Sequence, residues 1–208
     1  MIHELIRRFP ALASCQQDLQ SVISALIQCY EQGGKVMLCG NGGSCADCDH
    51  IVGELMKGFL KKRPLTDAQK EAMKSRFPLL DNGVLLKLQG GLPAISLPAF
   101  TALNSAYCND VDAELIYAQA LLALAKPADI LIAISTSGNS KNVAAAVAVA
   151  KGLGIKVIGL TGSNGGKLHA HADLCICVPE QETFKIQELH LPVYHCICAA
   201  VEAHFFKI

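Results

Sequence analysis

One stretch of the sequence decides the fold: residues 35–44, which read Lys-Val-Met-Leu-Cys-Gly-Asn-Gly-Gly-Ser. An apolar run that is typical of a strand passes there directly into a glycine turn and then into helix-like sequence. Backbone N–H groups, hydroxyls and the positive end of a helix meet in such a turn, where they can hold an anion such as phosphate. Two more turns of this kind follow apolar runs, at Ser135–Ser140 and at Thr161–Gly166. Together they predict a protein that binds something small and phosphorylated.

Short apolar runs alternate with helical patterns along the chain, which is typical of parallel strands buried on both faces. Right-handed crossovers then favour a flavodoxin-like, three-layer α/β/α sandwich around a five-stranded parallel sheet, plus an N-terminal helix. Ligands bind at the carboxyl ends of such strands, where all three turns lie. We expect strands over residues 35–39, 94–97, 129–134, 155–160 and 174–178, and helices over residues 11–31, 44–57, 115–125, 139–151 and 183–206.

Composition limits the classes of partner. The 208 residues predict a single domain, residues 1–208. Hydrophobic residues make up 51% and charged residues 17%, against about 45–50% and about 25% in typical soluble domains, so we expect surface that is buried between subunits. Lys+Arg and Asp+Glu both number 18, so no global field attracts nucleic acid or an anionic membrane.

The chain is expected to stay in the cytoplasm. None of its apolar runs reaches the ~20 residues that cross a bilayer, and the segment from Met1 is amphipathic rather than a signal peptide. Most of the ten cysteines lie in apolar runs, where reduced cysteine packs as a small hydrophobe. Cys45 and Cys48 form a C-x-x-C without the second pair that a zinc ribbon needs. Because both fall in the first turn of a predicted helix, a lowered thiol pKa is an open alternative there.

Two segments interrupt the regular pattern. Residues 61–91 are more polar, with a capping box at Thr66 and Gln69 that predicts a helix start, and we interpret them as an insertion or a mobile arm. Pro192 falls inside the last predicted helix, where it removes a hydrogen bond and predicts a kink.

A polar set accompanies the turns. His50 and Glu54 are four apart and share one face of a predicted helix. Gln187 and His195 are eight apart, about 80° around the last helix, so they can address one pocket. The four side chains could hold a divalent metal, or supply a carboxylate base and an imidazole acid. His190 points about 140° away from His195 and is expected to be structural or a subunit contact.

The second turn carries the strongest phosphate signal. Four of its six residues bear hydroxyls around a single glycine, which is more than a plain turn requires. Lys141 follows at the helix start, where its charge opposes the helix dipole unless an anion lies nearby.

These motifs in combination resemble the phosphoheptose isomerase branch of the sugar isomerase (SIS) domain family, over about residues 11–60 and 94–206. The residues that carry the resemblance are Gly40-Asn41-Gly42-Gly43-Ser44, His50-x-x-x-Glu54, Ser135-Thr136-Ser137-Gly138-Asn139-Ser140, Gln187-Glu188-x-His190 and His195. Residues 61–91 are longer than the corresponding link in that family, so they could cover the site or alter the choice of substrate.

The resemblance implies a phosphosugar site, one zinc ion per subunit and a homotetramer with sites between subunits. The implied substrate-binding residues are Asn41, Gly42, Gly43, Ser44, Glu54, Asn109, Asp110, Ser135, Thr136, Ser137, Ser140 and Gln187. Asn109 and Asp110 belong to the loop after a helix over residues 99–107. The implied zinc ligands are His50, Glu54, Gln187 and His195.

The implied reaction interconverts sedoheptulose 7-phosphate and D-glycero-D-manno-heptose 7-phosphate through an enediol, with Glu54 as base and His195 as acid. Zinc could share the acid's task by polarising the carbonyl. Glu54 as base and Glu54 as tight zinc ligand are alternatives. A non-catalytic SIS module is a second hypothesis, either one that binds a phosphosugar as a sensor or one that binds a protein, as a replication-initiation regulator with this domain does. A pure binding module, however, does not need the four polar residues together. A nucleotide-binding Rossmann protein is disfavoured because no G-x-G-x-x-G follows a strand.

Overall fold

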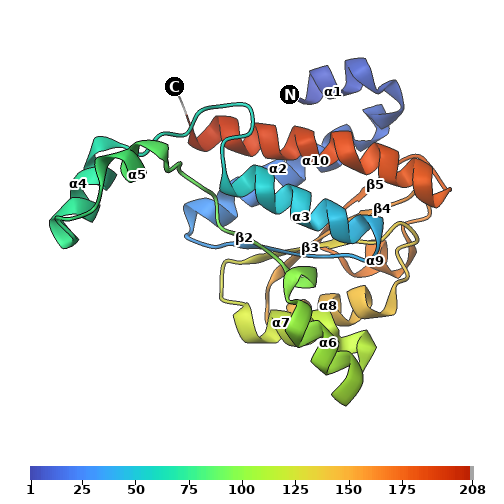
Figure 1. Cartoon of the computed structure of the whole chain (residues 1–208). Coiled ribbons are helices and arrows are strands. Elements are labelled where there is room, and N and C mark those ends of the chain that lie inside the picture. The colour runs from blue at the N-terminus through green and yellow to red at the C-terminus, as the bar shows by residue number, and fades with distance from the viewer. Residues whose placement is uncertain (207–208) are drawn as a thin grey trace.

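The computed structural model describes residues 1–206, which contain one five-stranded parallel sheet in the order β2-β1-β3-β4-β5. Helices α2, α3 and α10 cover one face of the sheet, with α1 packed on α2 and α10, and α7, α8 and α9 cover the other, with α6 packed on α7 (Figure 1). The predicted three-layer α/β/α sandwich is confirmed. The strands are β1 (Val36–Cys39), β2 (Ala94–Ser96), β3 (Ile130–Ile134), β4 (Lys156–Thr161) and β5 (Leu174–Cys177).

The apolar strand runs are continuous because both faces of the sheet are covered. In β1, Val36 and Leu38 face the core beneath α2, α3 and α10, whereas Met37 and Cys39 face the core beneath α7 and α8. Every residue of β1 and β3 is buried. Because all the strand pairs are parallel, the carboxyl ends of the strands, and therefore the glycine turns, lie along one edge.

The helices follow the predicted ranges with two corrections. The helices are α1 (Ile2–Arg8), α2 (Gln16–Glu31), α3 (Gly43–Met56), α4 (Asp67–Arg76), α5 (Asn82–Lys87), α6 (Thr101–Asp110), α7 (Ile116–Leu124), α8 (Lys141–Gly152), α9 (Gly166–His171) and α10 (Thr183–Phe205), with 3-10 helices η1 (Pro10–Cys15), η2 (Leu97–Ala99) and η3 (Ala113–Leu115). The predicted helix over residues 11–31 begins as η1, whose buried Leu12 and Cys15 are three apart, as a 3-10 turn requires. The helix expected to end at Tyr107 continues to Asp110.

Helix α10 runs without interruption through Pro192. The proline cannot donate to the carbonyl of Glu188, and both residues line a cavity that is open to solvent. The Glu188 carbonyl that lacks this hydrogen bond therefore lies on the solvent-facing side of the helix. None of the helices within residues 1–206 combines the length and hydropathy needed to span a bilayer.

Residues 61–91, called the arm below, form two helices that extend away from the sheet (Figure 1). The predicted capping box is present, since Thr66 Oγ1 accepts from the Gln69 backbone and Gln69 Oε1 accepts from the Thr66 backbone. The base of the arm is closed by a bridge between Pro64 and Gln89. Large apolar side chains of the arm and its root are exposed, among them Leu60, Phe77, Leu79 and Leu86.

A buried ion pair ties the root of the arm to both helices that carry the polar set. Arg63 Nε donates to Glu202 Oε1 at 2.9 Å, and the two side chains are 0% and 1% exposed. The guanidinium also donates to the last carbonyls of α3, Leu55 O at 2.6 Å and Glu54 O at 3.0 Å.

The Glu202 carboxylate accepts three backbone N–H groups as well, from Phe59, Leu60 and Lys61. Burial alone would raise the pKa of Glu202, but these donors and Arg63 hold it below its usual value. The pair therefore fixes the end of α3 against α10.

Replacement Glu202→Gln is expected to lower the free energy of unfolding by about 3 kcal/mol or more, because it leaves a buried guanidinium without a counter-charge. Urea unfolding followed by circular dichroism measures the loss. Glu4→Gln is the matched control, since the Glu4–Arg7 pair is exposed and contributes about 0.5 kcal/mol or less. Equal stability of the two variants would show that the buried pair does not hold the fold.

His190 is fully buried on α10, as expected for a structural residue. Neither ring nitrogen has a hydrogen-bond partner among the described residues. Burial lowers the pKa of His190 to about 4, because the imidazolium would lose its hydration.

This group makes stability depend on pH. The unfolded chain takes up a proton at His190 below about pH 6.5, and the folded chain only near pH 4, so stability falls as the pH drops through this window. The loss attributable to His190 is about 2 kcal/mol at pH 5 relative to pH 8. His190→Leu should remove that part of the difference in urea unfolding, whereas His3→Gln, at an exposed histidine, should keep it. An unchanged pH dependence in His190→Leu would contradict the assignment.

Candidate active site

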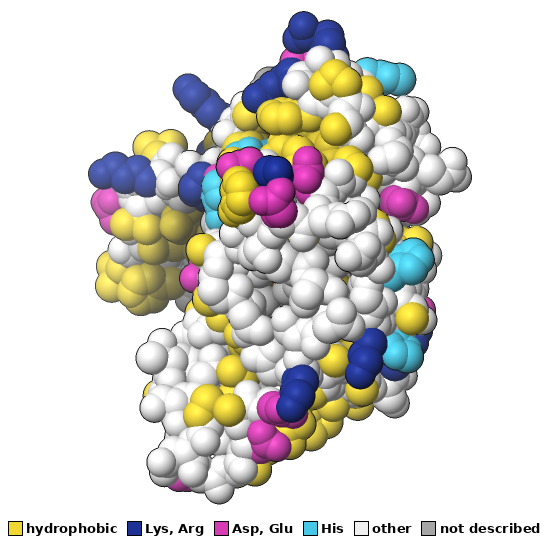
Figure 2. Space-filling model, turned by 90° about the vertical axis from the view of Figure 1, so that its right-hand side faces the viewer, with side chains coloured by type: hydrophobic (Ala, Val, Ile, Leu, Met, Phe, Trp, Pro, Cys, Tyr) yellow, Lys and Arg dark blue, Asp and Glu magenta, His cyan; other side chains and the backbone are white. Residues whose placement is uncertain are grey.

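The three glycine turns lie side by side at the carboxyl edge of the sheet, as predicted. A Cβ atom on Gly138 would lie 2.0 Å from the backbone oxygen of Gly165, so the second and third turns approach as closely as glycine allows. Leu168 N also donates to Gly138 O at 2.9 Å. Figure 2 views this edge and shows a hollow among uncharged polar side chains and backbone, with charged groups at its rim.

The first turn is held by two residues that sequence reasoning missed. Asn41 and Asn142 exchange amide hydrogen bonds, each at 2.8 Å, which join the first turn to α8. The Tyr117 hydroxyl lies 2.7 Å from Gly40 O and donates to it. Neither residue has a local sequence signal, because both come from other elements than the turn they hold.

The second turn is a loop of hydroxyls opening onto α8. Ser135 Oγ and Ser140 Oγ are 3.0 Å apart, and Ser137 Oγ accepts from Asn139 N at 3.2 Å. Gly138 adopts a φ of 66°, which a residue with a side chain rarely takes. Ser135 is buried and Ser137 is exposed, so the hydroxyls line the loop from its floor to its rim.

Helices α3 and α10 run side by side and bring the imidazoles of the polar set together. His50 Nε2 lies 3.2 Å from Glu54 Oε1 and 3.5 Å from His195 Nε2. The His50 and His195 rings are perpendicular, with centroids 5.0 Å apart, and Phe59 packs against His195 from the other side. Three of the four residues of the polar set, from two distant parts of the chain, thus meet at one point.

A hydrogen-bonded chain fixes the tautomer of His50. The Tyr194 hydroxyl donates to Asp47 Oδ1 at 3.2 Å, because an ionised carboxylate has no proton to give. It therefore accepts from His50 Nδ1–H, at 3.0 Å. The unprotonated Nε2 of His50 is then the atom that faces Glu54 and His195.

Acceptor atoms converge at this point, so the site is built for a positive charge. Glu54 is buried, and its Oε2 has no hydrogen-bond partner, although the exposed Lys57 ammonium lies 3.6 Å away. Lone pairs of His50 Nε2 and a carboxylate oxygen repel each other unless a proton or a metal ion lies between them. Burial lowers the pKa of His195, and the nearby His50 acts in the same direction. His195 also lies on the wall of a cavity of about 480 Å³ between α1 and α10. 

The remaining predicted residues lie elsewhere around this edge. Gln187 is beside the first turn, since a Cβ atom on Gly43 would lie 2.3 Å from its Nε2. It is two helical turns, about 12 Å along α10, from His195. Ser44 is buried at the start of α3. Asn109 and Asp110 were expected in a loop, but they are exposed in the last turn of α6, where the Asn109 side chain donates to Asp110.

The cysteines bring one correction and one addition. Burial raises the pKa of both Cys45 and Cys48, so the alternative of a lowered thiol pKa in the C-x-x-C is wrong. Among residues 1–206, His169, Cys175 and Cys177 form the one group of three His, Cys or acidic side chains whose ligand atoms all lie within 4.8 Å of one another. At the candidate active site, His50 contacts both Glu54 and His195, but the ligand atoms of these three residues are more widely spaced than those of the His169 group.

The comparisons with known proteins agree with this arrangement. The SIS domain family matches residues 100–203. The phosphoheptose isomerase of Methylibium petroleiphilum is 40% identical over 189 residues, which cover 89% of this chain and 82% of that protein. The phosphoheptose isomerase of Roseiflexus sp. is 37% identical over 187 residues, which cover 90% of this chain and 82% of that protein.

The chain belongs to the phosphoheptose isomerase family of SIS-domain proteins. The solved structure of the phosphoheptose isomerase from Neisseria gonorrhoeae agrees in fold, with a TM-score of 0.76 at 30% identity, covering 97% of this chain and 94% of that one. The resemblance read from the motifs is confirmed, and these family relatives match the chain on both sides of the arm.

Replacement Tyr194→Phe tests the hydrogen-bonded chain behind His50. Without the hydroxyl, Nδ1–H loses its acceptor, so His50 should populate both tautomers instead of one. Long-range ¹H–¹⁵N spectra of the imidazoles report the change, with His50→Gln used to assign the signal. Tyr107→Phe is the control, because Tyr107 lies on α6 and donates to Gln119 instead. A single, unchanged His50 tautomer in Tyr194→Phe would contradict the relay.

Proposed function

We propose that this chain is an aldose–ketose isomerase that interconverts sedoheptulose 7-phosphate and D-glycero-D-manno-heptose 7-phosphate. The observation that carries the proposal is the meeting of Glu54, His50 and His195 between helices α3 and α10, the first of which begins at the first glycine turn. Membership of the phosphoheptose isomerase family supports the choice of substrate.

The phosphate end of the substrate is assigned to the turns. Ser135, Thr136, Ser137 and Ser140 supply hydroxyls and backbone N–H groups at the start of α8, where the helix dipole favours an anion. The first turn, with Asn41, Gly42, Gly43 and Ser44, would contact the sugar, and Gln187 beside Gly43 would do the same. Asn109 and Asp110 are proposed as further sugar contacts at the exposed end of α6.

The isomerisation is assigned to Glu54 and His195. Glu54 Oε2, buried, without a hydrogen-bond partner and 3.6 Å from Lys57 Nζ, would take the proton from C1 of the ketose while His195 protonates the oxygen on C2. The resulting enediol would return the proton from Glu54 to C2 as His195 accepts the proton of the oxygen on C1. Burial and the nearby His50 lower the pKa of His195, so the neutral imidazole is favoured in the free site.

The polar set also fits one zinc ion per subunit. Two nitrogen ligands of a tetrahedral zinc ion are about 3.4 Å apart, and the facing Nε2 atoms of His50 and His195 are 3.5 Å apart. As the alternative to Glu54 acting as the base, we propose His50, Glu54 and His195 as its ligands, with Gln187 completing the set once its side chain turns from Gly43 toward them. When bound, zinc would polarise the sugar carbonyl as a Lewis acid.

The assembly is proposed to be a cytoplasmic homotetramer with sites between subunits. Exposed apolar side chains on the arm and its root, such as Leu79 and Leu86, give it surface to bury against another copy. Ten cysteines suit a reducing compartment.

Glu54→Gln and His195→Ala should each lower kcat for heptose phosphate interconversion by about 10² or more, because each removes a proton-transfer group. Product formation from sedoheptulose 7-phosphate is followed by NMR, with and without zinc. Substrate binding measured by calorimetry should persist in Glu54→Gln, since the amide keeps the shape of the side chain.

Glu31→Gln is the control, because Glu31 is exposed and pairs with His204 away from the site. Light scattering on the same samples checks that the oligomer is intact. Full activity of Glu54→Gln would exclude the proposed base, whereas binding without turnover in the unmodified protein would favour a non-catalytic module.

A further inference from the structure

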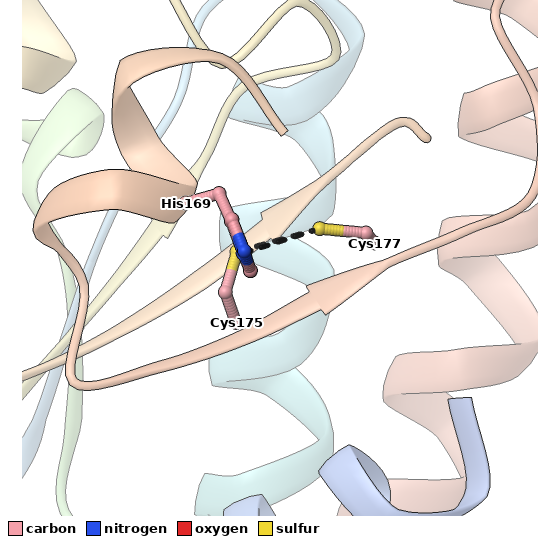
Figure 3. A group of neighbouring side chains, drawn as sticks. All are labelled: His169, Cys175 and Cys177. Carbon is pink, nitrogen blue, oxygen red and sulfur yellow. Dashed lines mark hydrogen bonds between the residues drawn. The ribbon is translucent and has the colours of Figure 1, made fainter. Parts of the chain in front are cut away.

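A second group of metal-binding side chains lies at the other edge of the sheet. Cys175 and Cys177 alternate along β5 and therefore point to the same side, and His169 reaches them from α9 (Figure 3). Cys177 Sγ lies 3.6 Å from His169 Nδ1 and 3.9 Å from Cys175 Sγ. The intervening Ile176 faces the opposite core, so the strand itself separates the thiols from that core.

These distances match those between ligands of a tetrahedral metal ion. With Zn–S bonds of about 2.3 Å and Zn–N bonds of about 2.0–2.1 Å, tetrahedral angles place two sulfurs about 3.8 Å apart and a sulfur and a nitrogen about 3.6 Å apart. All three ligand atoms lie within 4.8 Å of one another. No movement of the backbone is needed to bring them around one ion.

The surroundings of the group leave room for an ion. Gly159 on the neighbouring strand leaves space for the Cys175 thiol, since a Cβ atom there would lie 2.8 Å from Sγ. His169 is exposed, so a fourth position can be taken by water. Burial raises the pKa of both thiols, so a metal ion would displace their protons on binding.

We propose that His169, Cys175 and Cys177 bind a thiophilic divalent cation, with Zn²⁺ as the probe, at a site separate from His50 and His195. Such an ion would join α9 to the edge strand. Because the backbone N–H of Leu168 on α9 donates to Gly138 in the second turn, the bound ion would also stabilise the second and third turns.

Cobalt absorption tests the proposal. Reduced, metal-free protein is titrated with Co²⁺, and thiolate ligands give charge-transfer bands in the near ultraviolet that histidine and carboxylate ligands do not. We expect one Co²⁺ per chain with these bands, displaced by Zn²⁺. The bands should disappear when Cys175→Ser and Cys177→Ser are combined, and weaken in His169→Ala.

Cys108→Ser is the matched control, since Cys108 is an exposed cysteine on α6. Its bands should equal those of the unmodified protein, and circular dichroism without metal checks that all variants fold. Absence of thiolate bands at excess Co²⁺, or their survival in the double serine variant, would overturn the proposal. Because the signal comes from thiolates, the result is independent of whether the isomerase activity is found.

Discussion

The buried pair of Arg63 and Glu202 is the constraint on which the rest of the structure depends. The Glu202 carboxylate accepts hydrogen bonds from backbone N–H groups of the segment that follows α3. The Arg63 guanidinium donates to Glu202 and to two of the last carbonyls of α3, including that of Glu54. The backbone of a proposed catalytic residue is therefore held from beneath by α10. Since α10 also carries His195, the same ion pair helps to set the spacing between the proposed acid and the proposed base.

The carboxyl edge of the sheet shows a second constraint, the close approach of backbones. The hydroxyl loop and the third turn touch through glycines, and only a residue without a Cβ fits between them. The amide pair between Asn41 and Asn142 then joins the first turn to the helix that follows the loop. The proposed phosphate site is thus one connected layer rather than three separate turns.

Much of this could be predicted from the sequence, because the relevant signals are local. Apolar runs predicted the strands, and glycine turns predicted which edge of the sheet carries the site. The four-residue spacing predicted that His50 and Glu54 share one face of a helix. Tertiary partners could not be predicted: Tyr194 and Asp47 lie far apart in the chain, and Arg63 belongs to a segment that reads as polar although its side chain is buried. The group at His169 was missed because alternate cysteines in an apolar strand are also what ordinary packing produces.

The arm leaves and re-enters the body at one place, where Pro64 pairs with Gln89 and Gly90 donates to Arg63. The two ends of the arm are therefore held together between α3 and β2, independently of the residues between them. Closing a longer or shorter loop at fixed ends changes the entropy only slowly with length. Over evolution, this segment is free to vary in size and surface while the strand spacing beneath it stays the same.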